Sequence, residues 1–255
     1  MINIFDRTEI VAEMRAERLI AVLQSYVPKE QVTDDLIWSK IQAATKDMET
    51  RLRVFLEPVD MLPPSVEQDE KDVLTAAGTR WEDETGTDWD PDMFKGDKWG
   101  YFVTRHRPII SVASIKFIYP VSNQQIWTIP DNWIKLDKRY GHVRLVPSGT
   151  PFYAPLNSYM MSVAGGGKNI PDLVHIRYVS GLVDVHNDYP DIIDLIKRMA
   201  VLRIIDDAFV PQSGSIGADG LTESFGIDFQ KNRDQITEDI KTIKQELHGI
   251  PLMAV

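Results

Sequence analysis

Hydrophobic residues near the start of the chain recur at helical spacing. Thr33 is a typical N-cap residue, and the apolar residues after it are separated by 4, 3, 4, 4 and 3 positions until Pro58 ends the pattern. These residues are Ile37, Ile41, Ala44, Met48, Leu52 and Phe55. Because this spacing puts them on one face, it predicts a core helix. Earlier in the chain, Asp6 and Glu9 resemble a capping box and predict a first helix that ends near Pro28.

The C-terminal part of the chain predicts two more helices. Pro190 suits the first position of a helix, and apolar residues continue at helical spacing until Pro211. They are Ile192, Leu195, Ile196, Met199, Leu202, Ile205 and Phe209. The last pattern is a narrow seam with intervals of 7, 4, 3 and 4, and it consists of Phe229, Ile236, Ile240, Ile243 and Leu247. A seam of this width suits docking on one partner helix.

The middle of the chain has a different pattern. Residues 61–100 are acidic and rich in turn signals, which predicts a loop with one short helix around residues 67–77. Between Tyr101 and Gly181, β-branched and aromatic runs such as SVASIKFIYP, HVRLVP and LVHIRYVSG predict short strands. Gly141 lies in the turn of an expected hairpin, and residues 147–171 are expected to form a long surface loop.

These elements predict an α+β protein with a helical-bundle core built from the N- and C-terminal segments and a β-rich insertion between them. The expected division is residues 1–99 for the first helices and the acidic loop, 100–181 for the β-rich insertion, and 182–255 for the last helices. No internal repeat is visible in the sequence.

Composition and charge narrow the possible functions. The 255 residues include 38 Asp and Glu against 28 Lys and Arg, a formal net charge of −10, which argues against a general basic surface for DNA or RNA. The chain contains no cysteine, so disulfides, thiolate catalysis and cysteine zinc sites are excluded. No basic segment leads into an apolar run at the start, and no apolar window approaches the length of a membrane span. We therefore expect neither a secreted precursor nor a membrane protein.

No motif for catalysis or for cofactor binding is complete. The stretch GGGKN at residues 165–169 has Asn169 where a phosphate-binding loop needs a hydroxyl. Asp88, Asp90 and Asp92 have the spacing that begins a calcium loop, but Met93 and Trp99 occupy the places of its glycine and its glutamate. The five histidines are scattered, without metal-ligand spacing. The sequence thus predicts no catalytic, cofactor-binding or metal-binding residues, and we do not expect an enzyme.

The stretch PQSGSIGADGLTESFGID contains four glycines: Gly214, Gly217, Gly220 and Gly226. Such loops can cradle phosphate, but this one follows a predicted helix rather than a strand and lacks GxGxxG spacing. We interpret it as a hinge, because glycines let the chain redirect the final helix.

Four segments resemble the head-to-tail connector, or adaptor, proteins of tailed bacteriophages. TDDLIWSKIQAATKDMETRLRVFL is similar to the family's leading core helix, and GYFVTRHRPIISVASIKFIYP to its arginine-proline turn and following strand. LVHIRYVSGLVDVHNDYPDIIDLIKRMAVLRIIDDAF resembles its strand, glycine and proline-started helix. QSGSIGADGLTESFGIDFQKNRDQITEDIKTIKQEL resembles the tail of larger members. The acidic segment at residues 61–99 and the extended β region depart from the smallest connectors.

The resemblance implies a structural role without a cofactor. Family members form a homo-oligomeric ring, often a dodecamer, between the capsid portal protein and a tail terminator, collar or neck protein in the virion. Double-stranded DNA passes through the ring without specific binding, and an acidic chain suits such a lumen. The C-terminal seam is then a candidate contact with the portal or a neighbouring subunit, although its spacing equally fits the chain's own helices.

Two alternatives stay open. One is another neck, collar or baseplate subunit. The other is a metal-dependent or nucleotide-binding enzyme, motivated by the aspartate run and the glycine-rich loops.

Overall fold

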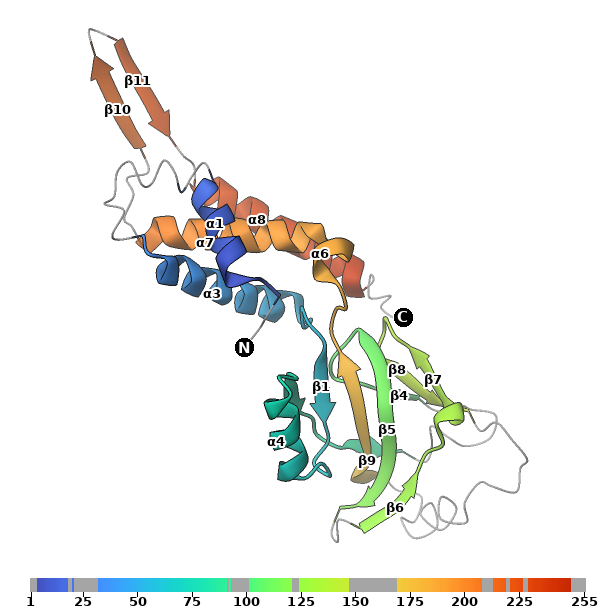
Figure 1. Ribbon diagram of the computed structural model, residues 1–255. Coiled ribbons are helices and arrows are strands. Elements are labelled where there is room, and N and C mark those ends of the chain that lie inside the picture. The colour runs from blue at the N-terminus through green and yellow to red at the C-terminus, as the bar shows by residue number, and fades with distance from the viewer. Residues whose placement is uncertain are drawn as a thin grey trace. The chain divides into compact units, whose positions relative to one another are not determined.

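The computed structural model describes residues 4–17, 20, 32–90, 92, 101–120, 124–146, 169–207, 213–218, 221–226 and 229–248. Helices and strands are both present, so the predicted α+β class is confirmed (Figure 1). The chain divides into two compact units, one formed by Met1–Glu57 with Asp184–Val255 and the other by Pro58–Val183. None of the helices in the described part of the chain combines the length and the apolar character that crossing a bilayer requires.

The first unit consists mainly of helices. Its described helices are α1 (Arg7–Ala16), α3 (Asp34–Leu52), α6 (Val185–Asp188), α7 (Pro190–Asp207) and α8 (Phe229–His248). The caps are those the sequence predicts, since Thr33 accepts a hydrogen bond from the Leu36 N–H at 3.2 Å and Asp6 accepts one from the Glu9 N–H at 2.9 Å. The helix α3 ends at Leu52, where Arg53 adopts a left-handed conformation, rather than continuing to Phe55.

Helices α3 and α7 pack against each other and supply much of the core of this unit. The predicted apolar face of α3 is buried from Ile37 to Leu52, and ten residues of α7 are buried. Ion pairs join the helices around this core. They are Arg7–Asp35, Arg15–Asp34, Glu13–Lys197, Lys40–Asp207, Asp47–Arg203, Asp206–Arg233 and Arg198–Asp239. Each exposed pair contributes little by itself, so burial stabilises the unit while the charges favour one pairing of helices.

The second unit is built on a six-stranded sheet in which β9 is central. Its strands are β1 (Val59–Leu62), β2 (Trp81–Asp83), β3 (Thr87–Trp89), β5 (Ile109–Tyr119), β6 (Gln124–Thr128) and β9 (Ile170–Ser180). The main order is β2-β1-β9-β5-β6, with β3 also pairing with β9. Only β1 and β2 pair in parallel; the other pairs of this sheet are antiparallel.

A three-stranded sheet with the order β4-β8-β7 lies beside the larger sheet in the same unit (Figure 1). Its strands are β4 (Tyr101–Val103), β7 (Ile134–Asp137) and β8 (His142–Leu145), and a 3-10 turn (Asp131–Trp133) precedes β7. The predicted hairpin is confirmed, since Gly141 lies in the β7–β8 turn with φ of 70°. A Cβ at this glycine would come within 2.6 Å of the Thr104 hydroxyl, so a larger residue fits neither the backbone nor the space.

The acidic segment belongs to the β unit, which corrects the expected division of the chain. The structure separates the units after Glu57 and after Val183, rather than at residues 99 and 181. The short helix is confirmed as α4 (Gln68–Ala76), but the flanking residues form β1, β2 and β3 instead of loop. These strands are three or four residues long, and their stability comes from pairing with β9 and with each other, which local composition does not reveal.

The glycine-rich stretch also differs from the expected loop. It contains β10 (Ser213–Ala218) and β11 (Leu221–Gly226), which pair through six residue pairs as a hairpin. Three of the four hinge glycines, Gly214, Gly217 and Gly226, lie in these strands, and Gly220 lies outside the described residues. The sequence did not predict this hairpin because its residues are mostly small or polar, whereas β-branched and aromatic side chains have the highest strand propensity. Whether the chain bends at this hairpin stays a prediction.

Truncating the core of the helical unit is expected to be costly. Ile41 is 1% exposed on α3, so Ile41→Ala should lower the free energy of unfolding by about 3 kcal/mol through lost burial and the cavity left behind. Urea unfolding followed by circular dichroism measures this loss. Ala43→Ser on the exposed side of the same helix is the control and should change stability by less than about 0.5 kcal/mol. Equal losses in both variants would contradict the assignment of this face.

Candidate interaction surfaces

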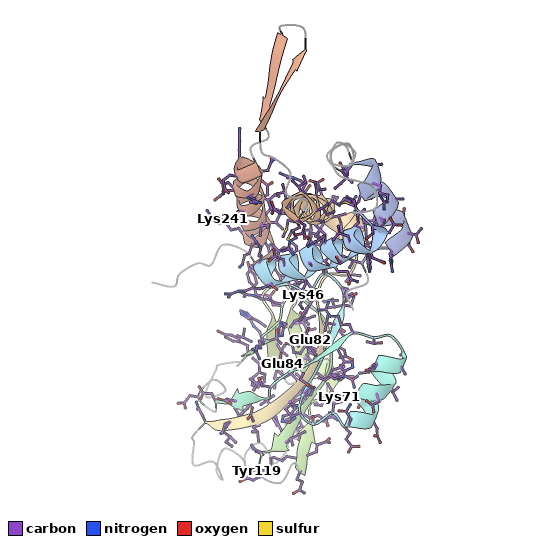
Figure 2. All side chains as sticks on the ribbon, turned by 90° about the vertical axis from the view of Figure 1, so that its left-hand side faces the viewer. Lys46, Lys71, Glu82, Glu84, Tyr119 and Lys241 are labelled. Atoms are coloured by element: carbon purple, nitrogen blue, oxygen red, sulfur yellow. The ribbon has the colours of Figure 1, made fainter. Side chains whose placement is uncertain are left out.

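A buried hydrogen-bond cluster joins the two sheets of the β unit. The Tyr178 hydroxyl of β9 donates to Glu84 Oε2 at 2.5 Å and accepts from the His106 N–H at 3.2 Å. Tyr178 is 1% exposed and Glu84 is 8% exposed, and Figure 2 marks Glu84 among the strands. The Thr104 hydroxyl lies 3.0 Å from the His106 carbonyl and 3.1 Å from the Gly141 carbonyl, which brings in the β7–β8 turn. The cluster therefore fixes the position of the three-stranded sheet.

The electrostatics of the cluster suit a structural hydrogen bond. Burial, followed by the hydrogen bond to Glu84, raises the pKa of the Tyr178 hydroxyl far above its usual range. The hydroxyl therefore keeps its proton and remains a donor to the carboxylate. Burial also lowers the pKa of His106 and that of His175, with nearby acidic groups opposing the shift in both cases.

The three-stranded sheet has one buried and one exposed face. Phe102, Val143 and Leu145 are buried, and Phe102 packs near Trp89 of β3 with a centroid distance of 6.3 Å. The opposite face carries the alternating residues, because successive side chains of a strand point to opposite sides. We call this exposed face the basic face, and its residues are Tyr101, Val103, Lys135, Asp137, His142 and Arg144.

Register fixes how the basic face is arranged. Arg144 of the middle strand lies between Tyr101 and Lys135 in one row, and His142 lies between Val103 and Asp137 in the next. The rings of Tyr101 and His142 are 4.8 Å apart. Tyr101 is 37% exposed and Val103 is 52% exposed, so the face combines apolar and cationic groups at the surface.

The chain segment that contains the basic face, residues 101–146, has a net positive charge, whereas the rest of the chain has a net negative charge. Residues 101–146 contain seven Lys and Arg against two Asp and Glu, whereas the remaining residues contain 21 against 36. Within the described part of the chain, neither Lys135 nor Arg144 is in an ion pair, in contrast to most cations of the helical unit. The net charge of the chain does not reveal this face, because it averages over all residues; a count of charges segment by segment does reveal it.

The helix α4 carries a second surface of opposite sign. Asp69, Asp72, Val73 and Ala76 follow i, i+3, i+4, i+7 spacing, and all four are exposed. We call these four residues the acidic stripe. Val73 is 67% exposed, the second-highest exposure among the exposed large hydrophobic residues after Val183.

The inner side of α4 is held by polar and aromatic contacts, because none of its residues is buried. Lys71 pairs with Asp83 and lies 5.2 Å from the centre of the Trp81 ring (Figure 2). The Trp81 indole N–H donates to the Thr75 hydroxyl at 2.9 Å. Arg177 of β9 pairs with Glu70 and also binds Asp60 at 2.9 Å. These contacts fix the helix on the sheet while its outer stripe stays exposed.

The predicted C-terminal seam lies on α8 but only part of it is deeply buried. Ile236 and Ile240 are each 5% exposed, and α8 packs on α7 and α3 of the same chain. Ile243 and Leu247 are half-buried, and the side chain of Phe229 lies outside the described residues. Packing on the chain's own helices thus accounts for Ile236 and Ile240, so these two residues are not an exposed docking surface.

The aspartates considered for calcium bind backbone groups. Asp88 accepts a hydrogen bond from the Asp172 N–H at 3.1 Å, and Asp90 accepts one from the Asp92 N–H at 2.8 Å. Among the residues that the structure describes, no group of three or more histidines and carboxylates has the arrangement of a metal site. Of the GGGKN stretch, only Asn169 is described.

No family model matches the chain, and the search of curated proteins finds no match either.

Removing the Tyr178 hydroxyl is expected to destabilise the β unit. Tyr178→Phe leaves the buried Glu84 carboxylate without this donor and the His106 N–H without this acceptor, which should cost about 2 kcal/mol of unfolding free energy. Chemical denaturation provides the measurement. Tyr119→Phe is the control, since Tyr119 is 48% exposed at the end of β5 (Figure 2), and it should change stability by less than about 0.5 kcal/mol. If Tyr178→Phe left the free energy of unfolding unchanged, the cluster would not be what holds the two sheets together.

The lowered pKa values of His106 and His175 predict a loss of stability in mild acid. As pH falls below the unfolded-state pKa of 6.5, the unfolded chain binds protons that the folded chain does not, so the free energy of unfolding decreases until the folded-state pKa is reached. We expect wild type to be less stable at pH 5.5 than at pH 7.5, values about one unit either side of the ordinary histidine pKa. In the double variant His106→Gln/His175→Gln this pH difference should shrink, whatever its stability at neutral pH. An undiminished difference would rule out these histidines as its source.

Proposed function

We propose that this protein is a structural component of a tailed phage, a head-to-tail adaptor whose subunits form a ring between the capsid portal and the tail or neck. The observation that carries the proposal is the packing of α3 against α7. These two helices contain the apolar patterns of two of the four segments that resemble connector proteins. The same pair is joined by the Arg203–Asp47 ion pair at 2.8 Å.

The remaining parts of the four segments also support the proposal. The arginine-proline turn at Arg107 and Pro108 leads directly into β5, and β9 is followed by Gly181 before the helix that Pro190 starts. The tail segment ends in the long helix α8. We further propose that the helical unit is the bundle core of the adaptor and that residues 58–183 are an insertion into it.

Charge supports the same proposal. A ring through which DNA slides benefits from walls that do not adsorb phosphate, and the chain outside residues 101–146 carries 36 acidic against 21 basic residues. The proposed ring is often twelve-membered, contains no catalytic site and binds the portal on one side and a tail terminator, collar or neck protein on the other. Closed rings require heterologous interfaces, which the elongated helices and the β unit offer.

A second candidate is another neck, collar or baseplate subunit. The resemblance to connectors favours the adaptor, whereas the β unit of residues 58–183 departs from the smallest connectors and suits a subunit with additional contacts.

The adaptor function predicts both assembly and a loss-of-function phenotype. The purified chain should form rings by electron microscopy and native mass spectrometry, alone or on its cognate portal, because the portal supplies a circular template. Deleting the gene should yield filled heads without tails, since the tail would lack its platform. The proposal fails if the chain shows no affinity for the portal and the deletion still gives full, tailed particles. A deletion that leaves tails attached but removes density from a collar or baseplate would favour the second candidate.

A further inference from the structure

We propose that the acidic stripe of α4 in one subunit docks on the basic face of a neighbouring copy of the same chain. This inference rests on the ring proposed above and names the surfaces that join its subunits. The acidic stripe is Asp69, Asp72, Val73 and Ala76, and the basic face is Tyr101, Val103, Lys135, Asp137, His142 and Arg144.

The basic face has the composition of a contact surface. Val103 and Tyr101 are among the exposed large hydrophobic residues; Tyr101 lies in the row of Arg144 and Lys135, and Val103 lies in the adjacent row. Both cations lack an ion pair within the described residues. The chain has ten more acidic than basic residues, yet these two cations lie together on one sheet face without an intramolecular ion pair. Such a face is electrostatically complementary to an acidic surface of a binding partner.

The acidic stripe is complementary in both charge and polarity. Two carboxylates, Asp69 and Asp72, correspond to the two cations, while Val73 and Ala76 correspond to Val103 and Tyr101. In the described part of the chain neither aspartate forms an ion pair. The inner side of α4 is held by Lys71, Trp81 and Arg177, so the stripe is fixed before it binds and little ordering entropy is lost.

The two surfaces lie on opposite sides of one unit, which is the requirement for head-to-tail association. The helix α4 packs beside β2 at one edge of the large sheet, and the β4-β8-β7 sheet lies on the other side of β9 and β5 (Figure 1). Like charges disfavour pairing of two basic faces or two acidic stripes, so the contact is heterologous. Repetition of such a contact gives a closed ring when the rotation between subunits closes.

A second copy fits the basic face better than nucleic acid does. Tyr101 and His142 lie against each other at 4.8 Å, so their facing sides are not open to bases. Asp137 lies opposite His142 in the second row, so the cations of this face are confined to the row of Lys135 and Arg144, which suits two carboxylates better than an extended run of phosphates.

Charge reversal tests the contact. We expect Lys135→Glu/Arg144→Glu and, separately, Asp69→Lys/Asp72→Lys to weaken self-association by about tenfold or more, because each places like charges across the interface. Sedimentation velocity and native mass spectrometry of the full chain at matched ionic strength measure the effect. Combining all four changes in one chain should restore association, since the charges become complementary again. That rescue separates a lost contact from a folding defect, which circular dichroism checks independently.

Lys241→Glu is the matched control, since Lys241 is exposed on α8 (Figure 2) and undergoes the same charge change as Lys135→Glu. It should leave association unchanged. If the wild-type chain forms rings but both double variants form them equally well, the named interface is wrong while the adaptor function stands. If wild type neither forms rings nor binds the portal, the adaptor function fails and this inference fails with it. Binding of a labelled oligonucleotide that is lost in Lys135→Glu/Arg144→Glu, with self-association intact, would assign the basic face to nucleic acid instead.

Discussion

The arrangement of the β unit depends on the hydrogen bond between the Tyr178 hydroxyl and Glu84. A carboxylate that is 8% exposed needs strong donors, and the tyrosine of the central strand supplies one at 2.5 Å. The same hydroxyl accepts the His106 N–H, which ties the residues between β4 and β5 to β9. Through Thr104 and the tight Gly141 turn, this one donor fixes where the three-stranded sheet lies. The direction of the basic face is thus set by a buried polar contact behind it.

The two units use charge in different ways. In the helical unit, cations pair with carboxylates of neighbouring helices, as Arg15 does with Asp34 and Arg203 with Asp47, so charge is largely compensated within the unit. In the β unit, Arg177 and Lys71 are compensated on the inner side of α4, whereas the charges of the basic face and the acidic stripe are left exposed. Exposed charges of opposite sign on separate surfaces favour association with a second copy, because complementary potentials select both the partner and its orientation.

Much of the fold was predictable because helical periodicity is a local signal. The Thr33 cap, the buried face of α3 and the proline-started α7 all follow from residue spacing. The strands β1, β2 and β3 were missed since they depend on pairing with each other and with β9, more than 80 residues away in sequence for β3. The hairpin β10–β11 was missed since its glycines and serines have low strand propensity. The spacing of the seam on α8 did not reveal which helix it packs against. In the structure, α8 packs on α7 and α3, and Ile236 and Ile240 of the seam are buried.

The sequence by itself determined the α+β class, the positions of the main helices, the β7–β8 turn at Gly141 and the acidic net charge. These properties follow from spacing, propensity and composition, which are local or additive along the chain. The tertiary structure decided which strands share a sheet, where the units divide, and which charges meet a partner within the chain. Those outcomes depend on contacts between distant segments: Tyr178 meets Glu84 across 94 positions, and Lys135 and Arg144 become neighbours only when β7 pairs with β8.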